Sequence, residues 1–295
     1  MGRVTSRVRT VRVDVATGSS RARPDLLAVE EPLELRLGGE PITITMRTPG
    51  HDVELAHGLL LAEGVVHSRD DVVQARYCAG AVVTSEAGTP QNTYNVLELD
   101  LAPGVPLPPP EVTRRFVTSS ACGVCGSASI EALRKRGRHD LRADRVRVAA
   151  DLLAGLPDRL REAQETFERT GGLHAAGLFT ADGELVVARE DVGRHNALDK
   201  VLGWALLEDR LPLREHVVVV SGRASFELVQ KAYLAGAPVL AAVSAPSSLA
   251  VETARDVGMT LAGFVRGDRL NLYAGEDRVL LPVPGEQDHP AHAHG

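Results

Sequence analysis

The sequence predicts an α/β fold divided into a smaller α+β part and a larger part built on a sheet with flanking helices. Strand-like and helical segments alternate between residues 173 and 275. This alternation is typical of parallel strands joined by right-handed helical crossovers. The strand HVVVVSG at 216–222 is continuously apolar, as expected for a sheet covered on both faces. The proline-rich stretch APGVPLPPPE at 102–111 predicts a linker between the two parts.

The composition indicates a globular protein whose core consists mainly of aliphatic side chains. Hydrophobic residues make up 44% of the 295 residues and charged residues 24%, whereas aromatic residues make up only 3%. The net charge of −6 argues against a general nucleic-acid binder. No stretch approaches the ~20 apolar residues of a membrane span, and no apolar signal core follows the N-terminus. Three cysteines do not make a disulfide framework, so we expect a cytoplasmic protein.

Residues 1–28 are predicted as an N-terminal extension, with one strand around Val11, Val13 and Val15 and a linker after it. The smaller α+β domain is expected to span residues 29–116. Its predicted elements are two strands within 31–50 joined by the Gly38-Gly39 turn, a helix with Asp52 as N-cap and Gly64 at its end, and strands at 77–83 and 93–101.

The larger domain is expected to span residues 117–285, and residues 286–295 are expected to be a disordered tail. Its predicted elements are helices at 127–136 and around 158–170, a hairpin at 173–191 over the turn Ala181-Asp182-Gly183, a helix at 196–208 with Asn196 as N-cap, the strand at 216–222, a helix at 225–237, a strand at 238–244, a helix at 247–258 and a final hairpin at 260–275.

Cys122 and Cys125 form a C-x-x-C pair within TSSACGVCGSASIEALRKR, directly before a predicted helix. Two such thiols could bind a metal, form a disulfide, perform redox chemistry or carry a group. A zinc site needs about four ligands, and Cys78 lies far away in the sequence without a matching partner. A zinc deaminase would show H-x-E, which does not occur. The position of the pair, after a long preceding domain, also differs from that of a thioredoxin-like motif.

The glycines at 123 and 126 favour an exposed loop over two buried structural cysteines. A thiolate at a helix N-terminus is a good nucleophile because the helix dipole lowers its pKa. Such a thiolate can accept a sulfane sulfur from a persulfide and pass it on.

Two further segments suggest an anion site, each with an ordinary structural alternative. VVVVSGRASFE contains a strand, a glycine turn and a helix start, so its backbone N–H groups and Arg223 could hold an anion. EDVGRHNALDK places Arg194 and His195 at another helix start. His174 is equally well explained as a strand histidine with its hydrogen bonds satisfied. Glu54 and Glu63 are expected to be solvated helix positions.

Four long segments resemble the FdhD/NarQ family, and the resemblance covers about residues 28–275. They are SSACGVCGSASIEAL, HAAGLFTADGELVVAREDVGRHNALDK, VVSGRASFELVQKAYLAGAPVLAAVSAPSSLAVETA and TPGHDVELAHGLLLAEGVV. The resemblance implies a cytidine-deaminase-like fold for the C-terminal domain, without that fold's zinc site and with no structural metal. It also implies a sulfurtransferase, or sulfur carrier, needed by formate dehydrogenase.

The resemblance further implies that a cysteine desulfurase supplies the sulfur. The sulfur then passes to the bis(molybdopterin guanine dinucleotide) form of the molybdenum cofactor before insertion into apo formate dehydrogenase. It places the persulfide on Cys122, with Cys125 as its companion, and GDP is the natural fragment ligand. The cofactor-binding residues that we expect are Phe264, Val265, Arg266, Gly267, Asp268 and Arg269, together with Arg223 and His195.

Two alternatives stay open, namely a cofactor chaperone without persulfide chemistry and a C-x-x-C disulfide oxidoreductase. The expected macromolecular partners are the desulfurase and the apoenzyme, with no nucleic acid and no membrane. If the protein self-associates, a homodimer is the oligomeric state to test for.

Overall fold

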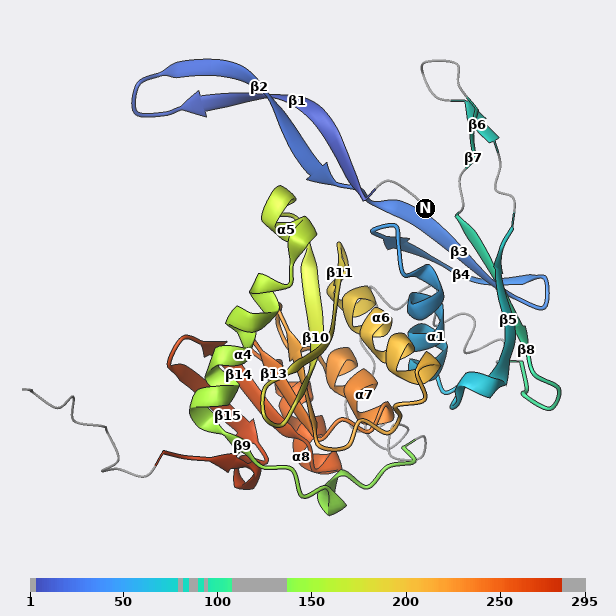
Figure 1. Cartoon of the computed structure of the whole chain (residues 1–295), viewed down its shortest axis with the longest axis vertical. Helices are drawn as coiled ribbons and strands as arrows, with labels where there is room; N and C mark the ends of the chain where they lie inside the picture. Colours follow the sequence, from blue (N-terminus) through green and yellow to red (C-terminus); the bar gives the residue numbers. More distant parts are fainter. Residues whose placement is uncertain (1–3, 79–81, 85–89, 93–94, 108–136, 283–295) are drawn as a thin grey trace, which may run out of the picture.

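The computed structural model describes residues 4–78, 82–84, 90–92, 95–107 and 137–282, drawn as ribbon in Figure 1. Cys122 and Cys125 lie outside the described residues, as do the predicted helix at 127–136 and the predicted tail.

A mixed six-stranded sheet forms the centre of the larger part. The strand order is β11-β10-β12-β13-β14-β15; β12 to β14 are parallel and the other neighbours antiparallel. The strands are β10 (His174–Thr180), β11 (Leu185–Asp191), β12 (His216–Val220), β13 (Val239–Ala242), β14 (Thr260–Arg266) and β15 (Arg269–Ala274). The predicted hairpins and parallel strands are thereby confirmed. The further expectation of a cytidine-deaminase-like arrangement stays a prediction.

Helices cover both faces of this sheet (Figure 1). The helices are α4 (Ala150–Glu162), α5 (Glu165–Thr170), α6 (Arg194–Leu207), α7 (Phe226–Leu234) and α8 (Ser248–Val257). Alternate residues of β12 divide between two cores: Val218 and Val220 pack with α6 and α7, whereas Val217 and Val219 pack with α4. Because side chains alternate across a strand, an entirely apolar strand is buried on both faces.

The N-terminal part contributes a four-stranded sheet and one helix. The sheet order is β4-β3-β8-β5, and the elements are β3 (Glu31–Leu37), β4 (Glu40–Arg47), α1 (Asp52–Ala62), β5 (Val72–Tyr77) and β8 (Val96–Leu101). The β3–β4 turn at Gly38-Gly39 has positive φ at both residues, as predicted for a two-residue hairpin loop.

Helices α1 and α6 pack with their backbones in close approach. A Cβ at Gly58 would overlap the backbone carbonyl of Asp199, and a Cβ at Gly203 would overlap that of Glu54. Only glycine fits at either position, and one continuous hydrophobic core therefore joins the four-stranded sheet to α6.

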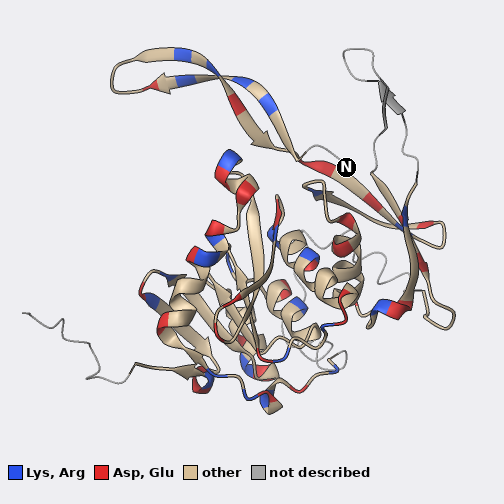
Figure 2. Cartoon of the chain, in the orientation of Figure 1, with Lys and Arg blue, Asp and Glu red and all other residues tan. Residues whose placement is uncertain are grey.

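The N-terminal extension differs from the prediction. Instead of one strand and a linker, β1 (Thr5–Asp14) and β2 (Ser19–Ala28) form a hairpin that projects from the body (Figure 1) and carries several arginines (Figure 2). The second strand was missed because both of its faces are largely exposed, so it lacks the apolar alternation that identifies a half-buried strand.

The remaining short elements are η1 (Arg69–Asp71), β6 (Val82–Thr84), β7 (Pro90–Asn92), η2 (Leu141–Ala143), β9 (Val148–Ala149), η3 (Glu276–Arg278) and β16 (Val279–Leu280). The strand expected at 77–83 overlaps the end of β5 at Tyr77 and the start of β6 at Val82, and residues 79–81 between them lie outside the described residues.

The helix expected around 158–170 is two helices, and the first starts earlier than predicted. α4 runs through Pro157 because Leu153, Leu156 and Leu160 bury one face of the helix against the sheet. This burial outweighs the usual cost of an internal proline.

The residues predicted as N-caps of α1 and α6 are not the N-caps of these helices. His51, in a left-handed conformation with φ 58°, is the N-cap of α1, and Asp52 is its first residue. Gly193 is the N-cap of α6, and Asn196 lies in its first turn. In both cases the side chain that sequence assigns to capping is engaged in a tertiary contact.

Candidate functional site

The candidate site lies along one edge of the six-stranded sheet. Because β12, β13 and β14 are parallel, their carboxyl ends meet at this edge, and β10 begins there because it is antiparallel to β12. In open α/β sheets, ligands bind outside the carboxyl ends of the strands. The loop after β12 carries Arg223, and the 264–269 stretch spans the end of β14, the turn after it and the first residue of β15.

The loops after β12 and β13 run side by side and have matching conformations. Ala224 and Pro246 form an isolated parallel bridge. The Ala224 N–H donates to the Ala245 carbonyl at 3.2 Å, and the Ser244 N–H donates to the Gly222 carbonyl at 3.3 Å. Each loop ends in a serine N-cap, at the starts of α7 and α8. Two helix N-termini, where backbone N–H groups are unpaired, therefore open at the same edge.

The two serine N-caps differ in what their side chains do. Ser247 Oγ accepts a hydrogen bond from the Ala250 N–H at 3.2 Å, as an ordinary cap does. Ser225 makes no side-chain cap and instead lies 3.1 Å from His195 Nε2. The loop after β12 is therefore organised by a histidine of α6.

The predicted cofactor-binding stretch is held against these loops. The Phe264 N–H donates to the Ser244 carbonyl at 3.2 Å, and Phe264 has a positive φ of 52° within an irregularity of the β14–β15 pairing. The residue is 43% exposed. Strained non-glycine backbone of this kind persists where the surrounding structure enforces it, and it is concentrated at functional sites.

The rest of that stretch is less uniform than the sequence suggests. The side chain of Val265 is buried in the core beneath the sheet, so it is not available to a ligand. Arg266 is exposed, and Gly267 forms the turn with φ 59°. Arg269 Nε lies 3.3 Å from Asp268 Oδ1, but both side chains are at least 87% exposed. Such a pair is weak and leaves Arg269 free to exchange partners.

His195 belongs to a ladder of opposite charges between α6 and α7. Its Nε2 lies 2.9 Å from Glu227 Oε2, and one turn further along Lys231 Nζ lies 2.8 Å from Asp199 Oδ1. The hydrogen bond from His195, opposed by burial, lowers the pKa of Glu227. Burial raises the pKa of Asp199, and Lys231 opposes that rise. The ladder fixes His195 in position beside the loop after β12.

His174 and Arg194 also lie at this edge; the sequence left the role of His174 undecided and suggested Arg194 as part of an anion site. A Cβ built on Gly222 would lie 3.5 Å from His174 Nδ1 and 3.6 Å from Arg194 Cδ. Burial, followed by the charges of Arg194 and His195, lowers the pKa of His174. The only signal in the sequence was the position of both residues at the ends of predicted elements.

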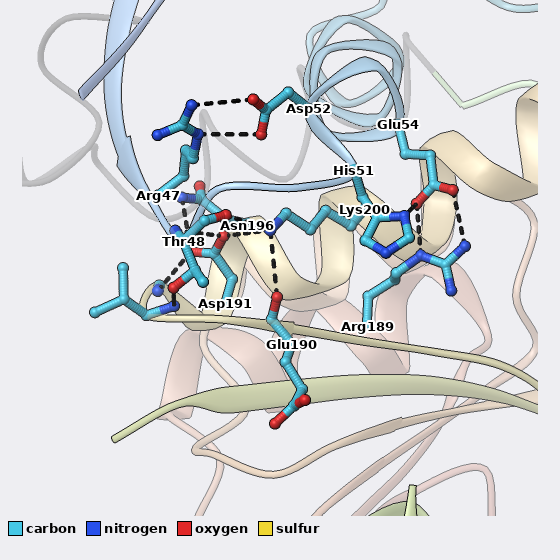
Figure 3. A network of polar contacts seen from close by, with 12 residues as sticks. Arg47, Thr48, His51, Asp52, Glu54, Arg189, Glu190, Asp191, Asn196 and Lys200 are labelled. Atoms are coloured by element: carbon cyan, nitrogen blue, oxygen red, sulfur yellow. Dashed lines mark hydrogen bonds and ion pairs between the residues drawn. The ribbon is translucent and has the colours of Figure 1, made fainter. Parts of the chain in front are cut away.

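The other polar residues of EDVGRHNALDK are structural. Lys200 Nζ lies 2.7 Å from Asp191 Oδ2 and donates to the Thr48 carbonyl at 2.9 Å, as Figure 3 shows. Asp191 accepts from the Thr48 N–H at 3.1 Å, and Asn196 donates to the Met46 carbonyl at 2.7 Å. These contacts fasten the segment between β4 and α1 to the start of α6.

Glu54, expected to be solvated, is part of the same attachment (Figure 3). Arg189 donates to both of its carboxylate oxygens, at 2.6 and 2.8 Å, and only 15% of the Glu54 side chain is exposed. On α1, Asp52 similarly accepts two 3.0 Å hydrogen bonds from Arg47. The expectation was wrong because Arg189 lies on a distant strand of the other sheet.

Two cavities, of about 310 and 730 Å³, lie away from this edge. They are lined by residues at the C-terminal ends of α7 and α8, including Tyr233, Val257 and Gly258. In the part of the chain that the structure describes, no group of three or more His, Cys, Asp or Glu is placed to hold a metal ion. Among these residues, too, no helix has the length and apolar character needed to cross a membrane.

The fold and the site together define a mixed α/β protein whose open sheet edge carries arginines, histidines and glycine turns suited to an anionic ligand. The FdhD/NarQ family model matches residues 28–280. The chain belongs to the FdhD/NarQ family.

Curated relatives resemble almost the whole chain. It is 56% identical over 276 residues to the sulfur carrier protein FdhD of Mycolicibacterium paratuberculosis, covering 94% of this chain and 99% of the relative. It is 56% identical over 283 residues to that of Streptomyces coelicolor, covering 95% and 98%. A crystal structure from Desulfotalea psychrophila, of a protein proposed to be a formate dehydrogenase accessory protein, has a similar fold. The TM-score is 0.70 at 23% identity, covering 94% of this chain and 100% of the other.

Proposed function

We propose that this protein is a sulfur carrier that takes up sulfur as a persulfide on Cys122 and passes it to a molybdenum cofactor. The observation that carries the proposal is the near full-length similarity to relatives named sulfur carrier protein FdhD. The C-x-x-C pair supplies the chemistry that such a role needs, because a thiolate is a strong sulfur nucleophile.

The loading step is a thiol–persulfide exchange. The Cys122 thiolate attacks the outer sulfur of a persulfide on a cysteine desulfurase. The bond between the two donor sulfurs breaks, and the desulfurase cysteine leaves as a thiolate. One sulfane sulfur moves, and no external oxidant or reductant is consumed. Glycines at 123 and 126, on either side of the pair's second cysteine in the sequence, give the backbone the freedom that suits a group meeting two partners in turn.

The acceptor in this proposal is the bis(molybdopterin guanine dinucleotide) cofactor, bound as substrate at the carboxyl edge of the sheet. Its pyrophosphates are anionic, whereas the protein carries a net charge of −6, so local cations are needed. Arg223 and Arg266 are exposed at this edge, and Arg269 is held only by an exposed neighbour. Phe264 is an exposed residue whose ring offers a flat surface for a guanine base.

The partners in this proposal are a cysteine desulfurase, which donates the sulfur, and apo formate dehydrogenase, which receives the sulfurated cofactor. The second partner is supported by the fold shared with the Desulfotalea psychrophila protein, itself proposed to be a formate dehydrogenase accessory protein. The exchange takes place in the cytoplasm, and the protein needs no structural metal. The same site permits one alternative, a cofactor chaperone whose cysteines bind the cofactor but carry no persulfide.

Mass spectrometry after incubation with a desulfurase and cysteine tests the carrier role. We expect the intact protein to gain the mass of sulfur, with the added atom on the peptide that contains Cys122. The Cys122→Ala variant should gain none while keeping the melting temperature of the wild type. A fully active Cys122→Ala variant of normal stability would contradict the proposal. Cofactor binding without any sulfur on Cys122 would favour the chaperone.

A further inference from the structure

Arg194, at the start of α6, has an unsatisfied guanidinium nitrogen, although its charge acts on Glu227. Within the described part of the chain, its guanidinium has no ion pair, and its Nε is buried without a hydrogen-bond acceptor. Both neighbouring carboxylates are engaged elsewhere. Asp191 is paired with Lys200 at 2.7 Å, and Glu227 lies 2.9 Å from His195. Buried donors are almost always satisfied in proteins, so an acceptor other than the described residues is expected here.

His174 lies beside Arg194 and shares its surroundings. It is the first residue of β10 and pairs with Asp191 on β11. Its Nδ1 faces the position that a side chain of Gly222 would take, 3.5 Å away, and Arg194 Cδ is 3.6 Å from the same point. Among the described residues, no group accepts from or donates to the His174 ring.

We propose that Arg194, His174 and the bare backbone of Gly222 form a subsite for the diphosphate group of a nucleotide. A guanidinium presents a planar fork that matches phosphate oxygens, and glycine allows a ligand to reach the backbone. The identity of the ligand rests on the proposed function. The subsite adds residues that neither the 264–269 stretch nor Arg223 supplies, on the inner side of the loop after β12.

Binding at this subsite is coupled to protonation of His174. The charged groups that face it are Arg194 and His195 on α6 and Asp191 on β11. Burial, followed by the charges of Arg194 and His195, lowers its pKa, whereas Asp191 opposes this shift, so the surroundings in the free protein favour the neutral ring. A diphosphate placed beside the ring favours the imidazolium, so binding takes up a proton. Affinity should accordingly rise as the pH falls from about 8 to about 6.

Calorimetric titration with GDP, and separately with inorganic pyrophosphate, tests the role of Arg194. Loss of a charged hydrogen bond should weaken binding about tenfold or more in Arg194→Gln, and less in Arg194→Lys. The matched control is Arg145→Gln, because Arg145 is exposed and lies in the loop after η2. All variants should melt within a few degrees of the wild type.

A steric variant tests the same subsite without changing its charge. The Cβ of Gly222→Ala would be in ordinary van der Waals contact with His174 and Arg194, so the protein should fold normally. The added methyl group would occupy the space assigned to phosphate. We therefore expect weaker binding of both GDP and pyrophosphate, with an unchanged melting temperature.

The proton coupling is measured by repeating the GDP titration between pH 6 and 8 in two buffers of different ionisation enthalpy. The phosphate of GDP titrates in part of this range, with a pKa of about 6, and it does so equally for every variant. His174→Gln should lose the proton uptake that the wild type shows beyond this common effect. His216→Gln, at the opposite end of the sheet, is the control and should retain it.

The outcomes separate this inference from the proposed function. The subsite is contradicted if Arg194→Gln and Gly222→Ala bind GDP as tightly as the wild type and His174→Gln shows the same proton uptake. The proposed cofactor site is not affected by that result. If the wild type binds neither GDP nor pyrophosphate, both the subsite and the proposed location of the cofactor are wrong. Sulfur loading on Cys122 is unaffected by either result.

Discussion

Lys200 Nζ lies 2.7 Å from Asp191 Oδ2, and neither side chain is more than 1% exposed. The remaining donors and acceptors of the pair are filled by backbone groups of Thr48, Glu190 and Gly193. A buried ion pair is tolerated only when its hydrogen bonds are complete, and here they are supplied by segments far apart in the sequence. The pair therefore holds the N-terminal part against the start of α6 and, through it, the site edge.

Removal of one partner of this pair should be strongly destabilising. Lys200→Met leaves the Asp191 carboxylate buried without its counter-ion, and we expect a loss of about 3–5 kcal/mol in the free energy of unfolding. Urea denaturation followed by circular dichroism measures it. Arg161→Met removes an exposed partner of Glu168 and is the control, with an expected loss below about 1 kcal/mol. Equal effects of the two substitutions would show that the buried pair has no special role.

The Glu54–Arg189 contact should make stability depend on acid pH. Burial raises the pKa of Glu54, but hydrogen bonds from Arg189 and His51 outweigh it, and the folded pKa is below the ordinary value of 4.5. Its contribution is thus present above pH 4.5 and is lost as the pH falls through the lowered pKa.

The isosteric variant Glu54→Gln checks this sign. We expect a loss of about 1–3 kcal/mol at pH 7, because a charged hydrogen-bonded pair is replaced by a neutral one. The difference from the wild type should shrink as the pH falls from 4.5 through the lowered pKa, where folded Glu54 itself becomes protonated. A difference that is the same at pH 3 and pH 7 would mean that the carboxylate charge does not matter. Glu168→Gln is the exposed control.

Cys125 is expected to act after loading, not during it. Its thiolate can attack Cys122 and form a disulfide, with release of the outer sulfur as hydrosulfide. Cys125→Ala should therefore load sulfur on Cys122 like the wild type but release it more slowly. Radiolabelled sulfur, chased with unlabelled cysteine, follows both steps. Release at the wild-type rate would assign Cys125 no resolving role.

The exposed arginines of the site edge should contribute to nucleotide binding. A charged hydrogen bond to phosphate is worth about 1.5–3 kcal/mol, so Arg269→Ala and Arg223→Ala should each weaken GDP binding by about one to two decades. Neither residue supports the core, so the melting temperature should be unchanged. Calorimetric titration with GDP measures the affinity of each variant relative to the wild type. Normal GDP affinity in both variants would remove these residues from the site, though not the sulfur chemistry at Cys122.

Prediction from sequence was most successful where the signal was local. The uninterrupted valines of β12 and the helical segments on either side of it identified parallel strands covered on both faces, and the structure confirms them. The Gly38-Gly39 turn was equally readable, because two adjacent residues with positive φ are needed there. The segments expected in the cofactor site lie near one edge of the sheet because parallel strands end on the same side.

Where prediction failed, the deciding partner was distant in the chain. Glu54 was expected to be a solvated helix position, but its partner Arg189 lies 135 residues away in the sequence. Asn196 looked like a helix cap, but its amide instead donates to the Met46 carbonyl. The second strand of the N-terminal hairpin carries no apolar alternation to mark it, since no core covers it.

The amino-acid sequence by itself determined the order and kind of most elements, the Cys122–Cys125 pair and the family, because each is encoded in neighbouring residues. Tertiary structure alone decided that Arg194 Nε is buried without a hydrogen-bond acceptor among the described residues, that burial and Arg194 lower the pKa of His174 and that Val265 is buried. Desolvation and ion pairing depend on which groups lie close in space. Only packing, here through the close approach of α1 and α6 at Gly58 and Gly203, brings those groups together.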